Sequence, residues 1–145
     1  MDYLTFDDLA VDHQLPPLTK PAITRTTLAY FCGASNDHNP IHVDIDFAKA
    51  AGKDDVFAHG MLSMAYVGQL LTHWIPQSAL RSFEVKFGAI VHVGDQITCR
   101  GTIVDKYSQG GEQRLRIKLS AADQRGEVKL VGEAIVAIAE RGSSD

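Results

Sequence analysis

Residues 60–74 read Gly-Met-Leu-Ser-Met-Ala-Tyr-Val-Gly-Gln-Leu-Leu-Thr-His-Trp, and this stretch decides the fold. Apolar side chains surround most of the circumference of a helix drawn over it, so we expect a largely buried helix rather than a surface one. Gly68 in its middle would cost an exposed helix about 1 kcal/mol. We therefore interpret Gly68 as a point of close contact with another backbone. Pro76 follows directly, where a helix is expected to stop.

The pattern after Leu80 changes to a period of two. Apolar and polar residues alternate, as in strands with one buried face, over three segments: 83–89, 97–103 and 115–119. Gly110-Gly111 predicts a hairpin turn. The last strand, within 128–139, is apolar on both faces near its end and is expected inside the sheet. The simplest way to cover such a sheet is to wrap it around the one long helix, which predicts an α+β fold.

The segment before the long helix is expected to be short-helical. Residues 14–24 contain three prolines, which predict an extended segment at a sheet edge or a strand start. Thr26 or Thr27 is expected to cap a short helix that ends near Ser35. A second short helix is predicted over 46–51.

Length and composition narrow the class of protein. A chain of 145 residues predicts a single domain, with residues 141–145 as a flexible tail. The net charge of −4 offers no basic field for nucleic acid, and no segment is long and apolar enough to span a bilayer, so we expect neither nucleic-acid nor membrane partners. The acidic N-terminus does not resemble a signal peptide, which favours a cytoplasmic location. Cys32 and Cys99 are interpreted as small buried hydrophobes.

The chemically active side chains concentrate in residues 31–42, which read Phe-Cys-Gly-Ala-Ser-Asn-Asp-His-Asn-Pro-Ile-His. Asp37 and His42 flank a rigid Asn39-Pro40 corner. A carboxylate and an imidazole held close together can bind one water molecule and move one proton. An ordinary Asx-turn, in which Asp37 caps and His42 packs, would give the same spacing. The spacing alone leaves both interpretations open.

His59-Gly60 stands at the start of the long helix. The first backbone N–H groups of a helix have no partner within it and attract negative charge. Gly60 would allow a thioester carbonyl to approach its N–H, as in an oxyanion hole, or it would simply permit a tight turn. His59 is interpreted as structural more readily than as catalytic. A metal held by Asp37, His38, His42 and His59 is a further alternative, but no HExxH or CxxC pattern supports it, and we expect neither a metal nor another cofactor.

The combined motif resembles a known family. Residues 34–42 (Ala-Ser-Asn-Asp-His-Asn-Pro-Ile-His) followed by 58–61 (Ala-His-Gly-Met) resemble the hydratase 2 signature of the MaoC-like (R)-specific enoyl-CoA hydratases and 3-hydroxyacyl dehydratases. Residues 83–87 and 93–95 are similar to that family too. The resemblance covers most of the chain and implies a single hotdog fold over 1–145, an antiparallel sheet wrapped around a long central helix.

The resemblance also implies a mechanism. Asp37 and His42 would activate water for addition to a trans-2-enoyl thioester of CoA or acyl carrier protein, or run the reverse dehydration. Gly60 would polarise the thioester carbonyl, and the substrate-binding set would also include His59, Asn39 and Ser63. The family usually has Gly where this chain has Asn36, and it often has a small hydroxyl residue near the position of Gly68. Asn tolerates positive φ better than most residues, so we expect the backbone bend at 36 to survive.

Other functions stay open beside this one. The same fold would serve an acyl-CoA thioesterase, which releases free thiol without hydrating a double bond. A non-catalytic acyl-thioester-binding subunit of a heterodimeric dehydratase is another alternative. Relatives of this size imply a homodimer whose two sheets join, although a heterodimer with a related chain is also compatible with the sequence.

Overall fold

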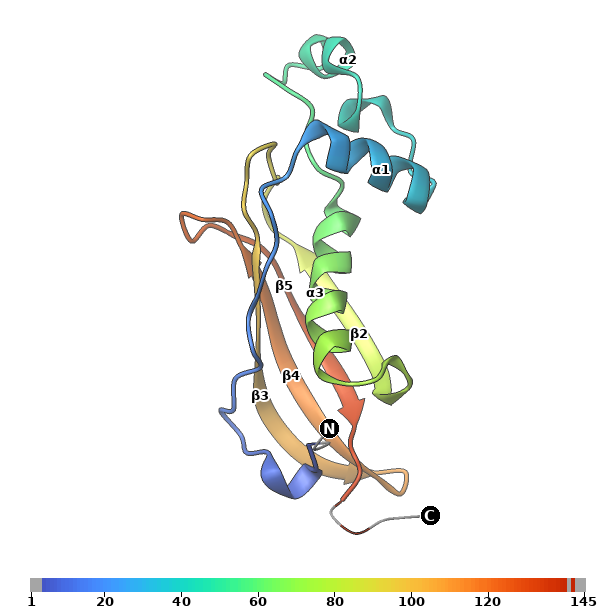
Figure 1. The fold of residues 1–145 in the computed structure, drawn as a ribbon, viewed down its shortest axis with the longest axis vertical. Coiled ribbons are helices and arrows are strands. Elements are labelled where there is room, and N and C mark those ends of the chain that lie inside the picture. The colour runs from blue at the N-terminus through green and yellow to red at the C-terminus, as the bar shows by residue number, and fades with distance from the viewer. Residues whose placement is uncertain (1–3, 141, 143–145) are drawn as a thin grey trace.

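The computed structural model describes residues 4–140 and 142. Within those residues, an antiparallel five-stranded sheet curls around one side of a single long helix, α3, Gly60–Trp74 (Figure 1). The spatial order of the strands is β1-β3-β4-β5-β2. Their bounds are β1, Leu18–Thr19; β2, Leu80–Phe87; β3, Thr98–Gln109; β4, Glu112–Ala122; and β5, Val128–Ala137. The predicted sheet wrapped around one helix is confirmed.

The sheet follows the alternation in the sequence. Leu115, Ile117 and Leu119 of β4 are fully buried toward α3, while the residues between them face outward. Gly110 and Gly111 join β3 to β4 with φ values of 61° and 76°, the left-handed conformation that a tight hairpin needs. Strand β5 lies between β4 and β2, which confirms its predicted interior position. The proline-containing edge is confirmed too, because β1 pairs only with β3.

Helix α3 begins and ends where the sequence predicted, but two expectations about it are wrong. It is not buried all round: Met61 is 53% exposed, and Ala65 and Gln69 on the same stripe are exposed as well. The reason is that the sheet covers only one side of the helix. Gly68 does not touch another backbone, since a Cβ there would meet only the Phe83 ring, at 3.6 Å.

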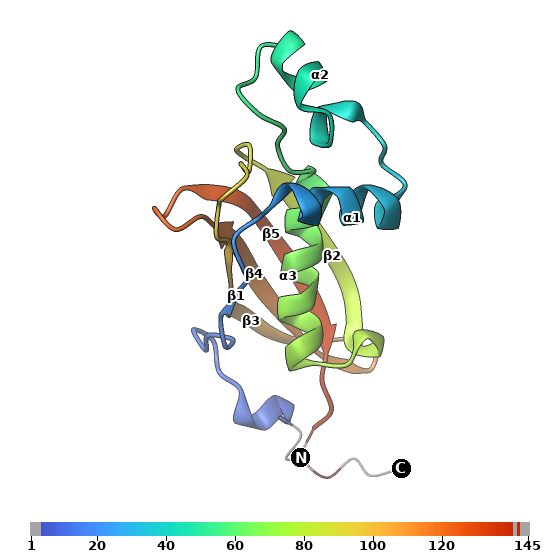
Figure 2. The same cartoon turned by 45° about the horizontal axis from the view of Figure 1, so that its top comes forward.

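Two shorter helices gather at the N-terminal end of α3 (Figure 2). Helix α1, Arg25–Ser35, is capped by Thr24, whose hydroxyl accepts a hydrogen bond from the Thr27 N–H at 3.1 Å. The cap therefore lies two residues before the first position predicted. Helix α2, Ile45–Ala50, is capped by Asp44. The 3-10 segments are η1, Phe6–Asp8; η2, Pro40–His42; and η3, Gln77–Ala79.

The two cysteines differ in their burial. Cys99 is buried, as expected, whereas Cys32 is only half-buried, and both are free thiols. Burial raises the pKa of the Cys99 thiol to about 11.

Among the described residues, none of the helices has the length and apolar character needed to cross a membrane. The tail expected at 141–145 lies, apart from residue 142, outside the described residues.

Candidate active site

The loop after α1 has a bend fixed by its own side chains. Asn36 ends α1 in the left-handed conformation, with φ 60° and ψ 19°, so the expected bend at this position is confirmed. The Asn39 side-chain oxygen accepts a hydrogen bond from the Ile41 N–H at 3.1 Å, and Pro40 begins η2. These contacts bring the chain round so that Asp37 and His42 lie near one another at the two ends of the loop.

A backbone carbonyl fixes the tautomer of the neutral His42 ring. Its side chain is nearly buried, and its Nδ1 lies 2.7 Å from the carbonyl oxygen of Phe57. A carbonyl can only accept, so Nδ1 carries the proton in the neutral ring. The other nitrogen, Nε2, keeps its lone pair and is the one that can act as a base.

His59 contacts both Asp37 and His42, the two members of the acid–base dyad. It is 1% exposed, and its ring stacks on the His42 ring with centroids 3.9 Å apart and planes 25° from parallel. Its Nε2 lies 3.2 Å from the backbone oxygen of Asp37. Burial lowers the pKa of His59, against the opposing effects of its bond to that carbonyl and of the Asp37 charge. The buried environment therefore favours the neutral form of His59.

Asp37, His42 and His59 bring their ligand-type atoms within 4.8 Å of one another. Among the described residues, Asp37 forms no ion pair with either ring. That spacing suits one water molecule between acid and base, and it would also suit one cation. Each ring, however, directs one nitrogen at a protein carbonyl, and the nitrogen left to His59 is buried. His38, the fourth residue considered for a metal, is exposed. The expectation that no metal binds stays a prediction.

A second group of polar atoms stands at the start of α3. Gly60 is the first residue of the helix, so its N–H has no partner within it. The Ser63 side chain is 2% exposed, and its hydroxyl has no hydrogen-bond partner among the described residues. Both residues line a pocket of about 260 Å³ with mainly apolar walls, made by Phe57, Ala58, Gly60, Ser63, Phe87, Gly88, Ala89, Ile90, Val91 and Lys129. Gly60 and Ser63 thus each bring a hydrogen-bond donor to the lining of this pocket.

Three contributors to the site were not anticipated from the sequence. The Phe57 carbonyl fixes the tautomer of His42, but a backbone group carries no signal in the sequence. The Phe87 ring lies against Gly60. Lys129 is fully buried and donates to the Ile90 carbonyl at 2.8 Å, so it fixes one wall of the pocket.

Lys129 is neutralised by acidic groups from two loops. It pairs with Glu127 and lies 3.5 Å from Asp95 and 3.6 Å from Asp123. Asp95 belongs to the 93–95 motif, but nothing in the sequence indicates that it pairs with a buried lysine. These ion pairs connect the loop before β3 to the turn between β4 and β5.

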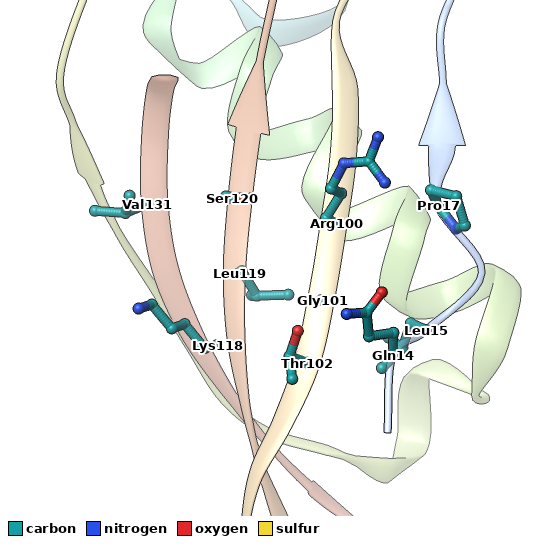
Figure 3. Close-up of a pocket in the computed structure, with 10 residues that line it drawn as sticks. All are labelled: Gln14, Leu15, Pro17, Arg100, Gly101, Thr102, Lys118, Leu119, Ser120 and Val131. Carbon is teal, nitrogen blue, oxygen red and sulfur yellow. The ribbon is translucent and has the colours of Figure 1, made fainter. Parts of the chain in front are cut away.

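Another pocket, of about 290 Å³, opens on the outer face of the sheet between the N-terminal segment and β3 and β4. Figure 3 shows its two cations: the Arg100 side chain points toward Pro17, whereas Lys118 points toward the side of Val131. Because the two charges do not converge, and because neither the dyad nor the start of α3 lines this pocket, we do not assign the chemistry to it.

Known proteins are similar to this chain over most of its length. A family model described as "MaoC like domain" matches residues 10–124. The (R)-specific enoyl-CoA hydratase of Rhodospirillum rubrum is 30% identical to the chain, over 94% of this chain and 93% of that protein. The 3-hydroxybutyryl-CoA dehydratase of Methylorubrum extorquens is 27% identical, over 98% of this chain and 88% of that protein.

A solved structure supports the fold itself. An unliganded R-hydratase from Pseudomonas aeruginosa superimposes with a TM-score of 0.82 at 24% identity, covering 94% of this chain and 86% of that one. At that identity the likeness concerns the architecture. It confirms that the curled antiparallel sheet with its central helix is a hotdog fold.

Proposed function

The chain belongs to the MaoC-like dehydratase family of hydro-lyases, and on that premise we propose that it adds water to trans-2-enoyl-CoA to give (R)-3-hydroxyacyl-CoA, or runs the reverse dehydration. The observation that carries this proposal is the fixed tautomer of His42, which leaves Nε2 free on a ring that lies close to the Asp37 carboxylate. The (R) configuration is carried over from the name of the Rhodospirillum rubrum relative.

The mechanism follows from the two groups of polar atoms. His42 Nε2 takes a proton from a water molecule that the Asp37 carboxylate orients, and the water oxygen bonds to Cβ of the enoyl group. The electron pair of the double bond moves onto the thioester oxygen, where the Gly60 N–H and the Ser63 hydroxyl stabilise the developing negative charge. The proton then returns to Cα, so that one water has been added in total. Asn39 supports the loop and takes no part in the chemistry.

The test is direct. Crotonyl-CoA is mixed with the purified protein, the loss of the conjugated enoyl-thioester absorbance is followed, and the product is analysed on a chiral column. We expect an (R)-3-hydroxy product with the wild type and none with Asp37→Asn. A release of free thiol without loss of the double bond would show a thioesterase instead. Binding without any turnover, on longer and branched enoyl-CoAs and on acyl-carrier-protein thioesters as well, would indicate a binding subunit.

We also propose a homodimer. Strand β2 is the last strand of the sheet, so its outer edge has no neighbour among the described residues. An open edge of eight residues is a template for pairing with another chain. Half-exposed Phe87 and Met61 lie at the same end of β2 and α3. Native mass spectrometry decides between a homodimer and a lone chain, and co-purification from the native host would reveal a heterodimer with a related chain.

The proposed location is the cytoplasm. Both cysteines are free thiols, as a reducing compartment would keep them. Fractionation of the native host, followed by detection of the protein in the soluble or another fraction, tests this proposal.

A further inference from the structure

We propose that His59 is a positioning residue for the reaction, one that holds both members of the dyad through two separate contacts. Its ring supports the His42 ring, and its Nε2–H donates to the backbone carbonyl of Asp37. This inference rests on the proposed function for the identity of the dyad. It goes beyond that proposal because it gives a working role to a side chain that does not face the pocket.

The contact with Asp37 determines the tautomer of His59. The acceptor is a carbonyl oxygen 3.2 Å away, so Nε2 must carry the proton. Nδ1 is then left as a bare acceptor, buried and without a partner among the described residues. An unpaired buried acceptor is unfavourable, and a phenylalanine would fill the same space without it. What a phenylalanine could not supply is the N–H that ties down Asp37.

Two aromatic rings hold the ring of His59. It stacks on His42, and the Phe31 ring meets it in a T-shaped contact, with centroids 5.0 Å apart and planes at 70°. The Phe57 ring meets His42 in a similar edge-on manner, at 5.2 Å. His42 is therefore held in its plane by the Phe57 carbonyl and against its face by His59. A base held in this way keeps Nε2 aimed at one point in space.

The stack also suits the charge that forms during turnover. His42 becomes positive when it accepts the proton, and the face of a neutral aromatic ring attracts a cation. The charged groups that act on His59 are His42 and Asp37, and burial is the largest influence on its pKa, which it lowers. Burial therefore favours the neutral form of His59 beside a protonated His42, which avoids two adjacent positive charges.

Two substitutions separate the two contacts. His59→Phe keeps an aromatic ring against His42 but has no N–H for Asp37. His59→Gln offers an N–H to the Asp37 carbonyl but has no ring. Both should lower kcat for hydration by about 10- to 100-fold with little change in KM, because each misplaces one group of the dyad without altering the pocket.

The pH–kcat profile adds a readout that a merely structural role would not move. Loss of the stacked ring in His59→Gln should shift the acid limb to lower pH, since the protonated form of His42 loses its support. His59→Phe should leave that limb in place. If both variants fold and retain the wild-type kcat and profile, the proposal is wrong, even if Asp37→Asn is inactive.

A measurement on the wild-type protein keeps the inference testable if the variants do not fold. Nitrogen-15 spectra of histidine-labelled protein report which nitrogen of each ring carries the proton. We expect the neutral form of His59 to carry its proton on Nε2. A proton on Nδ1 of His59 would overturn the proposal. This result does not depend on turnover, so it distinguishes a failure of the inference from a failure of the proposed hydratase activity.

Discussion

The Nδ1 atom of His42 lies 2.7 Å from the carbonyl oxygen of Phe57, and this contact decides which nitrogen of the ring can act as a base. It crosses from the loop after α1 to the segment that leads into α3. The same bond therefore fixes the chemistry of the ring and joins the two parts of the chain that carry the site.

This relationship makes an informative substitution possible. In His42→Asn, the side-chain N–H₂ group can replace Nδ1–H and still donate to Phe57, but nothing replaces Nε2. We expect hydration to slow by about 10²- to 10⁴-fold while the free energy of unfolding stays close to that of the wild type. His42→Ala should be equally slow and also about 1 kcal/mol less stable, because the Phe57 carbonyl loses its donor. Enoyl-CoA turnover and urea unfolding measure the two effects, and an active Asn variant would remove His42 from the mechanism.

Helix α3 offers a matched pair of glycines. A Cβ at Gly60 would lie 3.2 Å from two carbons of the Phe87 ring, whereas a Cβ at Gly68 would find ordinary contact with Phe83, at 3.6 Å. Gly60→Ala should push the half-exposed Phe87 ring aside and crowd the N–H at the start of the helix, lowering kcat/KM by about tenfold or more. Gly68→Ala should leave kcat/KM unchanged and stabilise the protein by up to about 1 kcal/mol. Equal effects of the two substitutions on kcat/KM would argue against an oxyanion role for the start of α3.

Much of the fold could be read from the sequence because its signals are local. The alternation around Leu115–Leu119 and the two glycines at 110–111 require no knowledge of distant residues. The exposed stripe at Met61 was missed because the sequence shows how apolar a helix is, but not how far a sheet reaches around it. The sequence does not predict what Gly68 contacts for the same reason, because packing places the Phe83 ring there and not a backbone.

The candidate site was predictable at the level of its side chains, though not of its supports. The resemblance of 34–42 and 58–61 to the family signature implies Asp37, His42 and Gly60, whereas their spacing alone leaves an Asx-turn equally open. The fold brings these two segments together. The carbonyl that orients His42 and the lysine at 129 that anchors the pocket wall come from elsewhere in the chain. A backbone oxygen has no sequence signature, and a lysine in a strand normally indicates a solvent-facing position.

The pairing of β5 with β2 should be unusually sensitive to substitution at Gly132. A Cβ at Gly132 would lie only 2.4 Å from the backbone oxygen of Glu84 in β2, so the two strands would have to separate. We expect Gly132→Ala to lower the free energy of unfolding by about 3 kcal/mol or more. Val131→Ala is the control, since Val131 is a half-exposed neighbour on the same strand and should cost less than about 1 kcal/mol. Urea unfolding gives both values, and amide hydrogen exchange should show the loss concentrated in β2.

The last prediction concerns acid stability, which Glu112 should influence at the far end of the sheet. Hydrogen bonds from Arg81, and then from Arg114, lower the pKa of Glu112 from its ordinary 4.5 to about 2. A carboxyl whose pKa is lower in the folded state stabilises the protein fully above its ordinary pKa, and that contribution disappears as the pH falls toward the folded value.

The thermal unfolding midpoint of the wild type should therefore exceed that of Glu112→Gln near neutral pH. The difference should shrink between about pH 4.5 and pH 2 as the wild-type carboxylate takes up its proton. Glu84→Gln serves as the control, because Glu84 has no ion-pair partner among the described residues, and it should leave the acid dependence of the midpoint unchanged. A difference between wild type and Glu112→Gln that persisted undiminished to pH 2 would mean that the Arg81 contact stabilises the sheet through packing rather than through the charge on Glu112.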